Sequence, residues 1–332
     1  TSHFLVTYTL NGVGDLIHLK NCPALSDVSI RGSRVCVSYG YNYYYGGRYC
    51  KAYSAQASLA NSSITIENST ILKSLDVKFD SELANTSIAV RNLTNNGITT
   101  FSYAADEGSL TSLDSSRFEG AVSLSSASGA TTAILKNNQF DGRVTVTVKA
   151  DSTVLLESNH LTASLQFASC YMQGGTITLS GNTIRSPPAS SVAALSFYRV
   201  QFRNCSIDLS DNTIRSPPAS SVAALSFYNS PSSAGTVHMW ARNIIDSSQG
   251  SGHAVSFDTA SKLNTGATLR MTDNTVTSAA GLRSFDVTLN GGQLLIDGTN
   301  TFTSHFLVTY TLNGVGDLIH LKNCPALGDV SI

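Results

Sequence analysis

The amino-acid sequence predicts an all-β chain wound into a parallel β-helix, with about eleven coils in each 302-residue repeat. Two internal repeats and a recurring strand-and-turn pattern predict this fold. The segment 1–30 returns at 303–332 with one change, Ser26 to Gly328. The segment NTIRSPPASSVAALSFY occupies 182–198 and again 212–228. Repeats of this length are typical of solenoids, in which each unit packs only on its neighbours.

The strand pattern is an apolar–x–apolar step followed by a short polar turn. Its second apolar residue, the anchor, recurs every 21 to 32 residues after a first step of 47 that contains an insertion. Alternating segments such as 143–148 supply a further strand, and period-two alternation is the strand signal. We therefore expect the anchors to stack in one parallel sheet with their side chains inward. They are Leu19, Ile66, Val90, Leu113, Leu135, Leu156, Leu179, Leu209, Met239, Met271, Ile296 and Leu321. Apolar residues five positions later are Phe118, Phe140, Leu161, Ile184, Ile214, Ile244 and Val276.

The polar turn carries asparagine at a fixed place, three residues after the anchor. Asparagine tolerates left-handed backbone and bonds neighbouring backbone groups, so it suits a corner. Stacked coils allow one amide to bond the next, which predicts an asparagine ladder. Cys22 occupies the same coil position, where we expect a buried free thiol. The ladder asparagines are Asn138, Asn159, Asn182, Asn212 and Asn274.

The pattern indicates one domain, residues 1–332, with 31–57 as an insertion and 303–332 beginning the repeat again. Charged residues make up 13% and the net charge is −1, which gives no electrostatic case for nucleic acid or an anionic membrane surface. No apolar run approaches the roughly 18 residues that a membrane span needs. With no initiator Met or signal region at Thr1, we expect a mature fragment or a window from a longer protein.

The turns LSGNTI (179–184), LSDNTI (209–214) and MTDNTV (271–276) resemble those of the pectate-lyase-type right-handed parallel β-helix superfamily. The resemblance covers nearly the whole chain and implies a fold, not a function. In overall texture the chain is also similar to the large β-helical surface proteins of flagellate protists, such as the trypanosomatid dispersed gene family.

Many enzymes of that superfamily cleave polysaccharides with acidic and basic residues gathered on one face, often around calcium. A polygalacturonase-like site would need paired Asp, Gly-His-Gly and Arg-Ile-Lys. The nearest fragment is Ser251–Ala254, which nothing else accompanies. The stacked Arg185 and Arg215 have no converging carboxylate, and no Cys/His spacing indicates zinc. We therefore predict no enzyme activity, no catalytic residue, no metal and no cofactor.

One 302-residue period contains five cysteines, an odd number that cannot pair completely within it. Cys36 and Cys50 bracket a Gly-rich loop with little core of its own, and we predict a disulfide between them and an oxidising compartment. Cys170 and Cys205 are a second candidate pair, which requires a folded turn between neighbouring coils.

The insertion is rich in tyrosine, which suits recognition because each ring adds contact area with few rotors to freeze. The alternative is that these rings only cover the side of the solenoid. The candidate contact residues are Tyr39, Tyr41, Tyr43, Tyr44, Tyr45 and Tyr49.

Five N-x-[ST] sequons fall in two registers, five residues before an anchor or two after it. Both registers lie on turns, where an attached glycan can point outward. The predicted N-glycosylation sites are Asn61, Asn68, Asn85, Asn92 and Asn204.

These observations predict a structural extracellular or cell-surface filament protein of tandem β-helix repeats that propagate end to end. Its expected partners are copies of itself along the solenoid axis, and glycans. One alternative is an adhesin or carbohydrate-binding surface module that uses the tyrosine-rich loop. A second alternative is a polysaccharide lyase or hydrolase. The terminal copies favour continuation within one polypeptide over the joining of separate chains.

Overall fold

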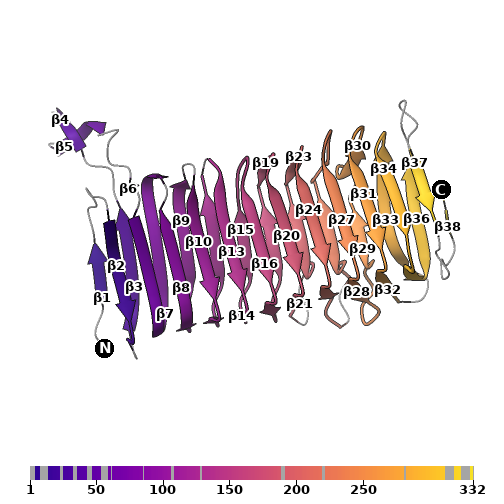
Figure 1. The fold of residues 1–332 in the computed structure, drawn as a ribbon, viewed down its shortest axis with the longest axis horizontal. Coiled ribbons are helices and arrows are strands. Elements are labelled where there is room, and N and C mark those ends of the chain that lie inside the picture. The colour runs from indigo at the N-terminus through magenta and orange to yellow at the C-terminus, as the bar shows by residue number, and fades with distance from the viewer. Residues whose placement is uncertain are drawn as a thin grey trace.

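The computed structural model is a single stack of short parallel strands along one long axis (Figure 1). The predicted all-β, parallel β-helical fold is confirmed, and no helix occurs in the described part of the chain. The strands follow three columns that run along the axis, and the interior coils contribute to each column in turn. The structure describes residues 4–7, 14–22, 25–32, 36–42, 47–53, 59–60, 62–84, 86–105, 108–127, 129–187, 191–218, 221–279, 282–310, 318–322 and 330–331.

The first column carries the anchors and opens each coil. Its strands are β2 (Gly14–Lys20), the first part of β7 (Ser62–Ala84), β8 (Ser87–Asn95), β10 (Ser109–Asp114), β13 (Thr131–Lys136), β16 (Thr153–Glu157), β20 (Thr176–Ser180), β24 (Ser206–Ser210), β27 (Val237–Ala241), β31 (Thr268–Thr272), β34 (Gln293–Asp297) and β37 (Leu318–Leu321).

The second column follows the polar turn and is made of short strands. They are β11 (Arg117–Phe118), β14 (Gln139–Phe140), β17 (His160–Leu161), β21 (Thr183–Arg185), β25 (Thr213–Arg215), β28 (Ile244–Ser247), β32 (Thr275–Ser278) and β35 (Thr301–Thr303).

The third column closes the coil. Its strands are β1 (Phe4–Thr7), β3 (Leu25–Gly32), the later part of β7, β9 (Thr99–Ala105), β12 (Val122–Ser126), β15 (Val144–Thr147), β18 (Leu165–Ala168), β22 (Leu195–Tyr198), β26 (Leu225–Tyr228), β29 (Val255–Phe257), β33 (Arg283–Asn290), β36 (His305–Tyr310) and β38 (Val330–Ser331).

Six further strands lie outside these columns. They are β6 (Leu59–Ala60), the side strands β19 (Tyr171–Gln173), β23 (Gln201–Arg203) and β30 (Lys262–Asn264), and the hairpin strands β4 (Cys36–Asn42) and β5 (Gly47–Tyr53). The last is paired antiparallel to β4, and Figure 1 draws this hairpin beside the first coils, outside the stack.

The register of the first column confirms eleven of the twelve predicted anchors. Leu19 pairs with Ile66, and each later anchor pairs with the next as far as Leu209. Eleven such parallel pairings lead from Leu19 to Leu321 in the described residues, in agreement with eleven coils per repeat.

The predicted anchor Met239 is wrong by one residue. Trp240 pairs with Leu209 and is 1% exposed, whereas Met239 is 40% exposed. The same shift replaces Ile244, which is exposed, by the fully buried Ile245. A shift of one residue turns every side chain of a strand to the other face. Burial of the large indole and the place of Asn243 in the turn favour the observed register. They outweigh the apolar alternation of the strand, which favours the register with Met239 inward.

The core also contains a stack of four phenylalanines in the third column. Phe167, Phe197, Phe227 and Phe257 lie in successive coils, with ring centroids 5.0, 4.7 and 4.2 Å apart and nearly parallel planes. All four are at most 4% exposed. Offset-stacked rings add about 0.5–1.5 kcal/mol per pair beyond their burial.

The predicted asparagine ladder is present and is longer than expected. It adds Asn243 and Asn300, so that seven buried amides join by Nδ2 to Oδ1 hydrogen bonds of 2.9–3.1 Å. Each Oδ1 from Asn159 onward also accepts the backbone N–H of the preceding asparagine. Cys22 lies at this position and its N–H donates to Ser69 Oγ, but the free thiol is only partly buried.

Candidate functional site

The tyrosine-rich insertion is described only in its backbone. In the β4–β5 hairpin, Tyr39 lies opposite Cys50 and Tyr41 opposite Arg48. Tyr43, Tyr44 and Tyr45 lie outside the described residues, as do the side chains of the other candidate contact residues, Tyr39, Tyr41 and Tyr49. The contact role of this loop stays a prediction.

The hairpin backbone brings Cys36 opposite Tyr53, three residues along the strand from Cys50, and the side chains of both cysteines are outside the described residues. Their disulfide stays a prediction. Cys170 and Cys205 are free in the structure, which does not form the second candidate pair. The two cysteines flank the paired strands β19 and β23 at opposite ends, so the strand length separates them. The Cys170 thiol instead contacts the N–H of Val148, at 3.4 Å.

Three of the five sequons have a described asparagine, and all three are exposed. Asn68, Asn92 and Asn204 have φ angles of 48°, 48° and 50°, in the left-handed region that asparagine tolerates. Asn68 and Asn92 lie in adjacent coils, where the Asn92 amide donates to Asn68 Oδ1 at 3.1 Å. Asn61 and Asn85 lie outside the described residues.

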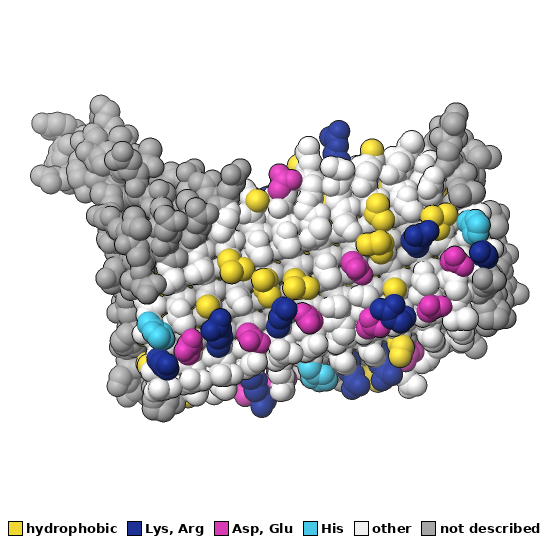
Figure 2. Space-filling model, in the orientation of Figure 1, with side chains coloured by type: hydrophobic (Ala, Val, Ile, Leu, Met, Phe, Trp, Pro, Cys, Tyr) yellow, Lys and Arg dark blue, Asp and Glu magenta, His cyan; other side chains and the backbone are white. Residues whose placement is uncertain are grey.

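A row of alternating charges crosses the outer face of the first column. Successive pairings place Lys20, Glu67, Arg91, Asp114, Lys136 and Glu157 one coil apart, with a change of sign at each step. Figure 2 shows a line of alternating basic and acidic side chains along the long axis. The Lys136 and Glu157 side chains approach to 2.7 Å, and Glu67 lies 3.9 Å from both Lys20 and Arg91. The alternation makes neighbouring coils complementary.

A second cluster of charges occupies the turn after this column, further along the axis. Arg242 bonds both carboxylate oxygens of Asp211 at 2.7 Å. This hydrogen-bonded ion pair lowers the pKa of Asp211, and the backbone N–H and hydroxyl of Thr299 lower the pKa of Asp273. Both carboxylates are exposed, so we assign these pairs a role in coil register and only a small stabilisation.

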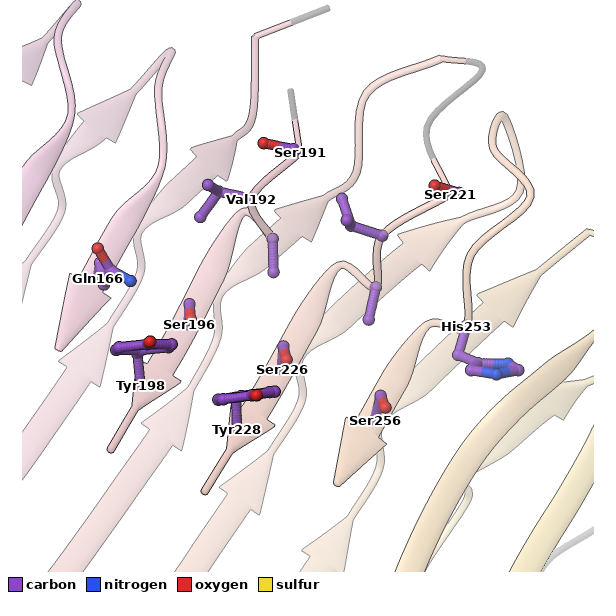
Figure 3. Close-up of a pocket in the computed structure, with 13 residues that line it drawn as sticks. Gln166, Ser191, Val192, Ser196, Tyr198, Ser221, Ser226, Tyr228, His253 and Ser256 are labelled. Atoms are coloured by element: carbon purple, nitrogen blue, oxygen red, sulfur yellow. The ribbon is translucent and has the colours of Figure 1, made fainter. Parts of the chain in front are cut away.

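A cavity lies on the outer face of the third column, where the two copies of the duplicated segment stack (Figure 3). It is an open groove of about 390 Å³. Tyr198 and Tyr228 lie parallel at the ends of β22 and β26, with ring centroids 5.3 Å apart and planes within 7°. In Figure 3 the two rings lie at the arrowhead end of these strands, and the loops that carry Ser191 and Ser221 border the opposite side.

A polar row runs along this groove. Gln166, Ser196, Ser226 and Ser256 occupy one register position in four successive coils. Their outward direction follows from the strand period, because the alternate residues Phe167, Phe197, Phe227 and Phe257 form the core stack. The same duplication therefore supplies both the inner aromatic stack and the outer polar groove.

The described lining contains one imidazole and no carboxylate, ammonium or guanidinium group. His253 belongs to the Ser251–Ala254 fragment, and its Nδ1 is buried without a partner among the described residues. No cluster of three or more metal-ligating side chains occurs in the residues that the structure describes. No helix that could cross a membrane is found in that part of the chain.

Sequence reasoning missed this groove, although the signal was present in the duplicated segment. Each copy ends in Ser-Phe-Tyr, so a stack of the two copies places Tyr198 beside Tyr228 and Ser196 beside Ser226. His253 comes from the next coil, where it occupies the place of Ala223 in the aligned strands. No family model, curated protein or solved structure matches this chain.

Proposed function

We propose that the chain is one period of an extracellular or cell-surface β-helical filament that continues end to end in 302-residue units. The observation that carries this proposal is the position of the repeated segment in the stack. In the first copy Phe4 pairs with Val28, and in the second copy Phe306 pairs with Val330. These are the same residues 302 positions apart, so both copies use the same coil geometry.

The two copies differ in the neighbour that each contacts. Leu19 of the first copy pairs with Ile66 of the coil that follows it. Leu321 of the second copy pairs with Ile296 of the coil that precedes it. The two copies together therefore show a neighbour on each side of this coil. If the last coil of one unit is also the first coil of the next unit, the stack continues with no open strand edge between the units. Open strand edges are sites of association that natural solenoids cover.

The charges at this register position near the two ends of the first column support continuation within one polypeptide. Asp297 lies one coil before Lys322, whose N–H donates to Ile296 O at 2.9 Å, and Lys20 lies one coil before Glu67. A continuous chain would place Lys322 between Asp297 and the counterpart of Glu67 in the next unit. Two separate chains joined end to end would stack Lys322 on Lys20, and like charges in opposite positions destabilise a sheet.

The test is a chain of two units, residues 1–332 followed by 31–332, imaged beside the single unit. Because strands stack about 4.8 Å apart, eleven added coils lengthen the rod by about 53 Å. Hydrogen exchange should find the junction coil as protected as interior coils. Two rods joined by a rapidly exchanging segment would refute the proposal.

A variant pair tests the role of charge at the junction. Lys322→Glu in the two-unit chain brings three acidic residues into successive coils, so we expect faster hydrogen exchange at the junction than in the parent. Lys322→Arg keeps the charge and should leave the exchange rate unchanged. Equal exchange in both variants would show that the charge at this position does not stabilise the junction.

The hairpin β4–β5 (residues 36–42 and 47–53) favours adhesion as a second candidate function, because it stands outside the stack (Figure 1). Removal of residues 31–57 should then abolish binding to a partner cell and leave the rod intact. Unchanged binding by the shortened chain would exclude a contact role for the loop.

A further inference from the structure

The row of alternating charges on the outer face of the first column carries more charge than the stacking of coils requires. This charged row comprises Lys20, Glu67, Arg91, Asp114, Lys136 and Glu157, in six successive coils. In the next four coils the same register position is uncharged, and the strands pair equally regularly. These uncharged residues are Ser180, Ser210, Ala241 and Thr272. Since exposed ion pairs contribute little to stability, the charges point to a contact outside the stack.

The signs of the charged row are complementary to the same row in reverse order. The row begins with a basic residue, alternates at every coil and ends with an acidic one. A second copy of the chain, turned by a two-fold rotation about the strand direction, presents the row reversed. If the rotation axis lies between Arg91 and Asp114, every charge faces one of opposite sign. The facing pairs, each formed twice, are Lys20 with Glu157, Glu67 with Lys136, and Arg91 with Asp114.

A shift of one coil reverses this match. The second copy would then bring Glu67 opposite Glu157, Arg91 opposite Lys136, and Asp114 opposite itself. Like charges that face one another across an interface are strongly unfavourable. The row therefore favours one antiparallel register and opposes its two nearest alternatives.

The residues beside the charged row allow two such faces to approach. Two positions before each charge, the second to sixth coils hold an uncharged side chain that is partly exposed. The strand period points these side chains outward with the charges. They are Thr65, Ala89, Ser112, Ile134 and Leu155. Face-to-face contact therefore buries no unpaired charge in this second row.

The size of the face sets the expected strength of the contact. Six coils about 4.8 Å apart and strands of about five residues give a face of about 29 by 17 Å. Each chain would bury roughly 500 Å², which is the low end for specific contacts. Figure 2 shows the line of charges open to solvent along the long axis. From its self-complementary signs we infer that this face binds a second copy of the chain, antiparallel and in one register, as a weak dimer.

The inference concerns the side of the rod and does not rest on the filament proposal. Sedimentation equilibrium of the single 332-residue chain tests it, with dimers expected at submillimolar concentration. Raising the salt concentration from about 0.1 M to about 1 M shortens the screening length from about 10 Å to about 3 Å. We expect the dissociation constant of the dimer to rise about tenfold or more over this range.

A matched pair of variants assigns the dimer to the charged row. Arg91→Asp faces Asp114 of the second copy with an acidic residue in both halves of the interface. The dissociation constant should rise about tenfold or more. Lys322→Asp makes a similar change of charge at the same register position, outside the six coils, and should leave the constant unchanged.

The double variant Arg91→Asp, Asp114→Arg separates the interface from the stack. Across the interface it restores opposite charges in every facing pair. Along the chain it places like charges in neighbouring coils, beside Glu67 and beside Lys136. We expect it to dimerise as tightly as the parent, although hydrogen exchange should find these coils less stable. A row that serves stacking alone would instead leave the double variant at least as impaired as Arg91→Asp.

Chemical cross-linking tests the register. Carbodiimide joins a lysine amine to a carboxylate in contact with it. Lys20 and Glu157 lie five coils apart in one chain, about 24 Å, so a bond between them must join two chains. Peptide mass spectrometry of the cross-linked dimer should recover this pair.

Four results would overturn the inference. They are a chain that stays monomeric at submillimolar concentration and low salt, which would leave the face to a different partner, and a dimer that salt does not weaken. The others are equal dissociation constants for Arg91→Asp and Lys322→Asp, and a cross-linked dimer without the Lys20–Glu157 pair. None of these results would affect the rod-length test, so the two proposals fail independently.

Discussion

Replacing Asn212 by alanine removes one amide from the middle of the asparagine ladder. Its Oδ1 accepts two hydrogen bonds from Asn182, one from the backbone N–H and one from Nδ2, both 3.0 Å. Its Nδ2 donates to Leu179 O at 2.7 Å and to Asn243 Oδ1 at 3.0 Å. The site is 1% exposed, so bulk water does not replace these bonds in the folded chain.

The magnitude follows from these contacts. Four hydrogen bonds at about 1 kcal/mol each give about 4 kcal/mol of lost stability. Buried groups left without partners cost more than the bond itself, so we expect about 3–6 kcal/mol. The loss should concentrate in the coils that contain Asn182 and Asn243, because a solenoid transmits strain mainly to nearest neighbours.

Native-state hydrogen exchange is the appropriate assay, since long repeat arrays depart from two-state unfolding. The Asn182 N–H should lose several orders of magnitude of protection, while coils near β10 keep theirs. Gln201→Ala, an exposed side-strand substitution, is the control and should change stability by less than about 0.5 kcal/mol. Protection of the Asn182 N–H equal to the parent would show that the ladder contributes little.

Three further predictions follow from buried side chains. Trp240→Ala should destabilise the chain by about 3–5 kcal/mol in denaturant titration, whereas Met239→Ala should cost less than about 1 kcal/mol; the reverse order would restore the sequence-based register. Burial lowers the pKa of His238 to about 3, from 6.5 in the unfolded chain. Between these values the unfolded state binds more protons, so stability should fall with decreasing pH by up to about 1.4 kcal/mol per unit. His238→Leu, beside Ile207 and Leu269 in the column, should flatten this slope, and an unchanged slope would assign it to other groups. Burial raises the pKa of the Cys170 thiol to about 11, so iodoacetamide at pH 8 should alkylate it only after denaturation, as peptide mass spectrometry would show; rapid labelling of the native chain would contradict this.

The fold was predictable because the core repeats once per coil. Eleven anchors and five ladder asparagines were correct, since an aliphatic side chain and a turn amide recur together at nearly constant spacing. The failure at Met239 has a physical reason. Val237 and Met239 alternate as two inward-facing residues should. Only the three-residue step from Trp240 to Asn243 shows that Trp240 is the anchor and faces inward.

The groove was harder to predict because its residues come from different coils. Tyr198, Tyr228 and His253 approach one another only when three coils stack in register. The sequence contains the duplication but does not show which face a terminal Tyr takes. The charged row was hidden for the same reason, since Lys20 and Glu67 are neighbours only across the insertion.

The duplicated segment has a consequence for how the chain reaches its native state. Residues 182–198 and 212–228 have the same sequence and pair with each other in register, Ile184 with Ile214 and Phe197 with Phe227. A growing stack can therefore seat the second copy on the preceding coil and expel the first copy as a loop. This mis-threaded state keeps local contacts but loses the burial of one coil, so it is a kinetic trap, not a stable rival. Asp211, whose counterpart beside the first copy is Gly181, keeps its pair with Arg242 in both arrangements, so this local contact does not distinguish them.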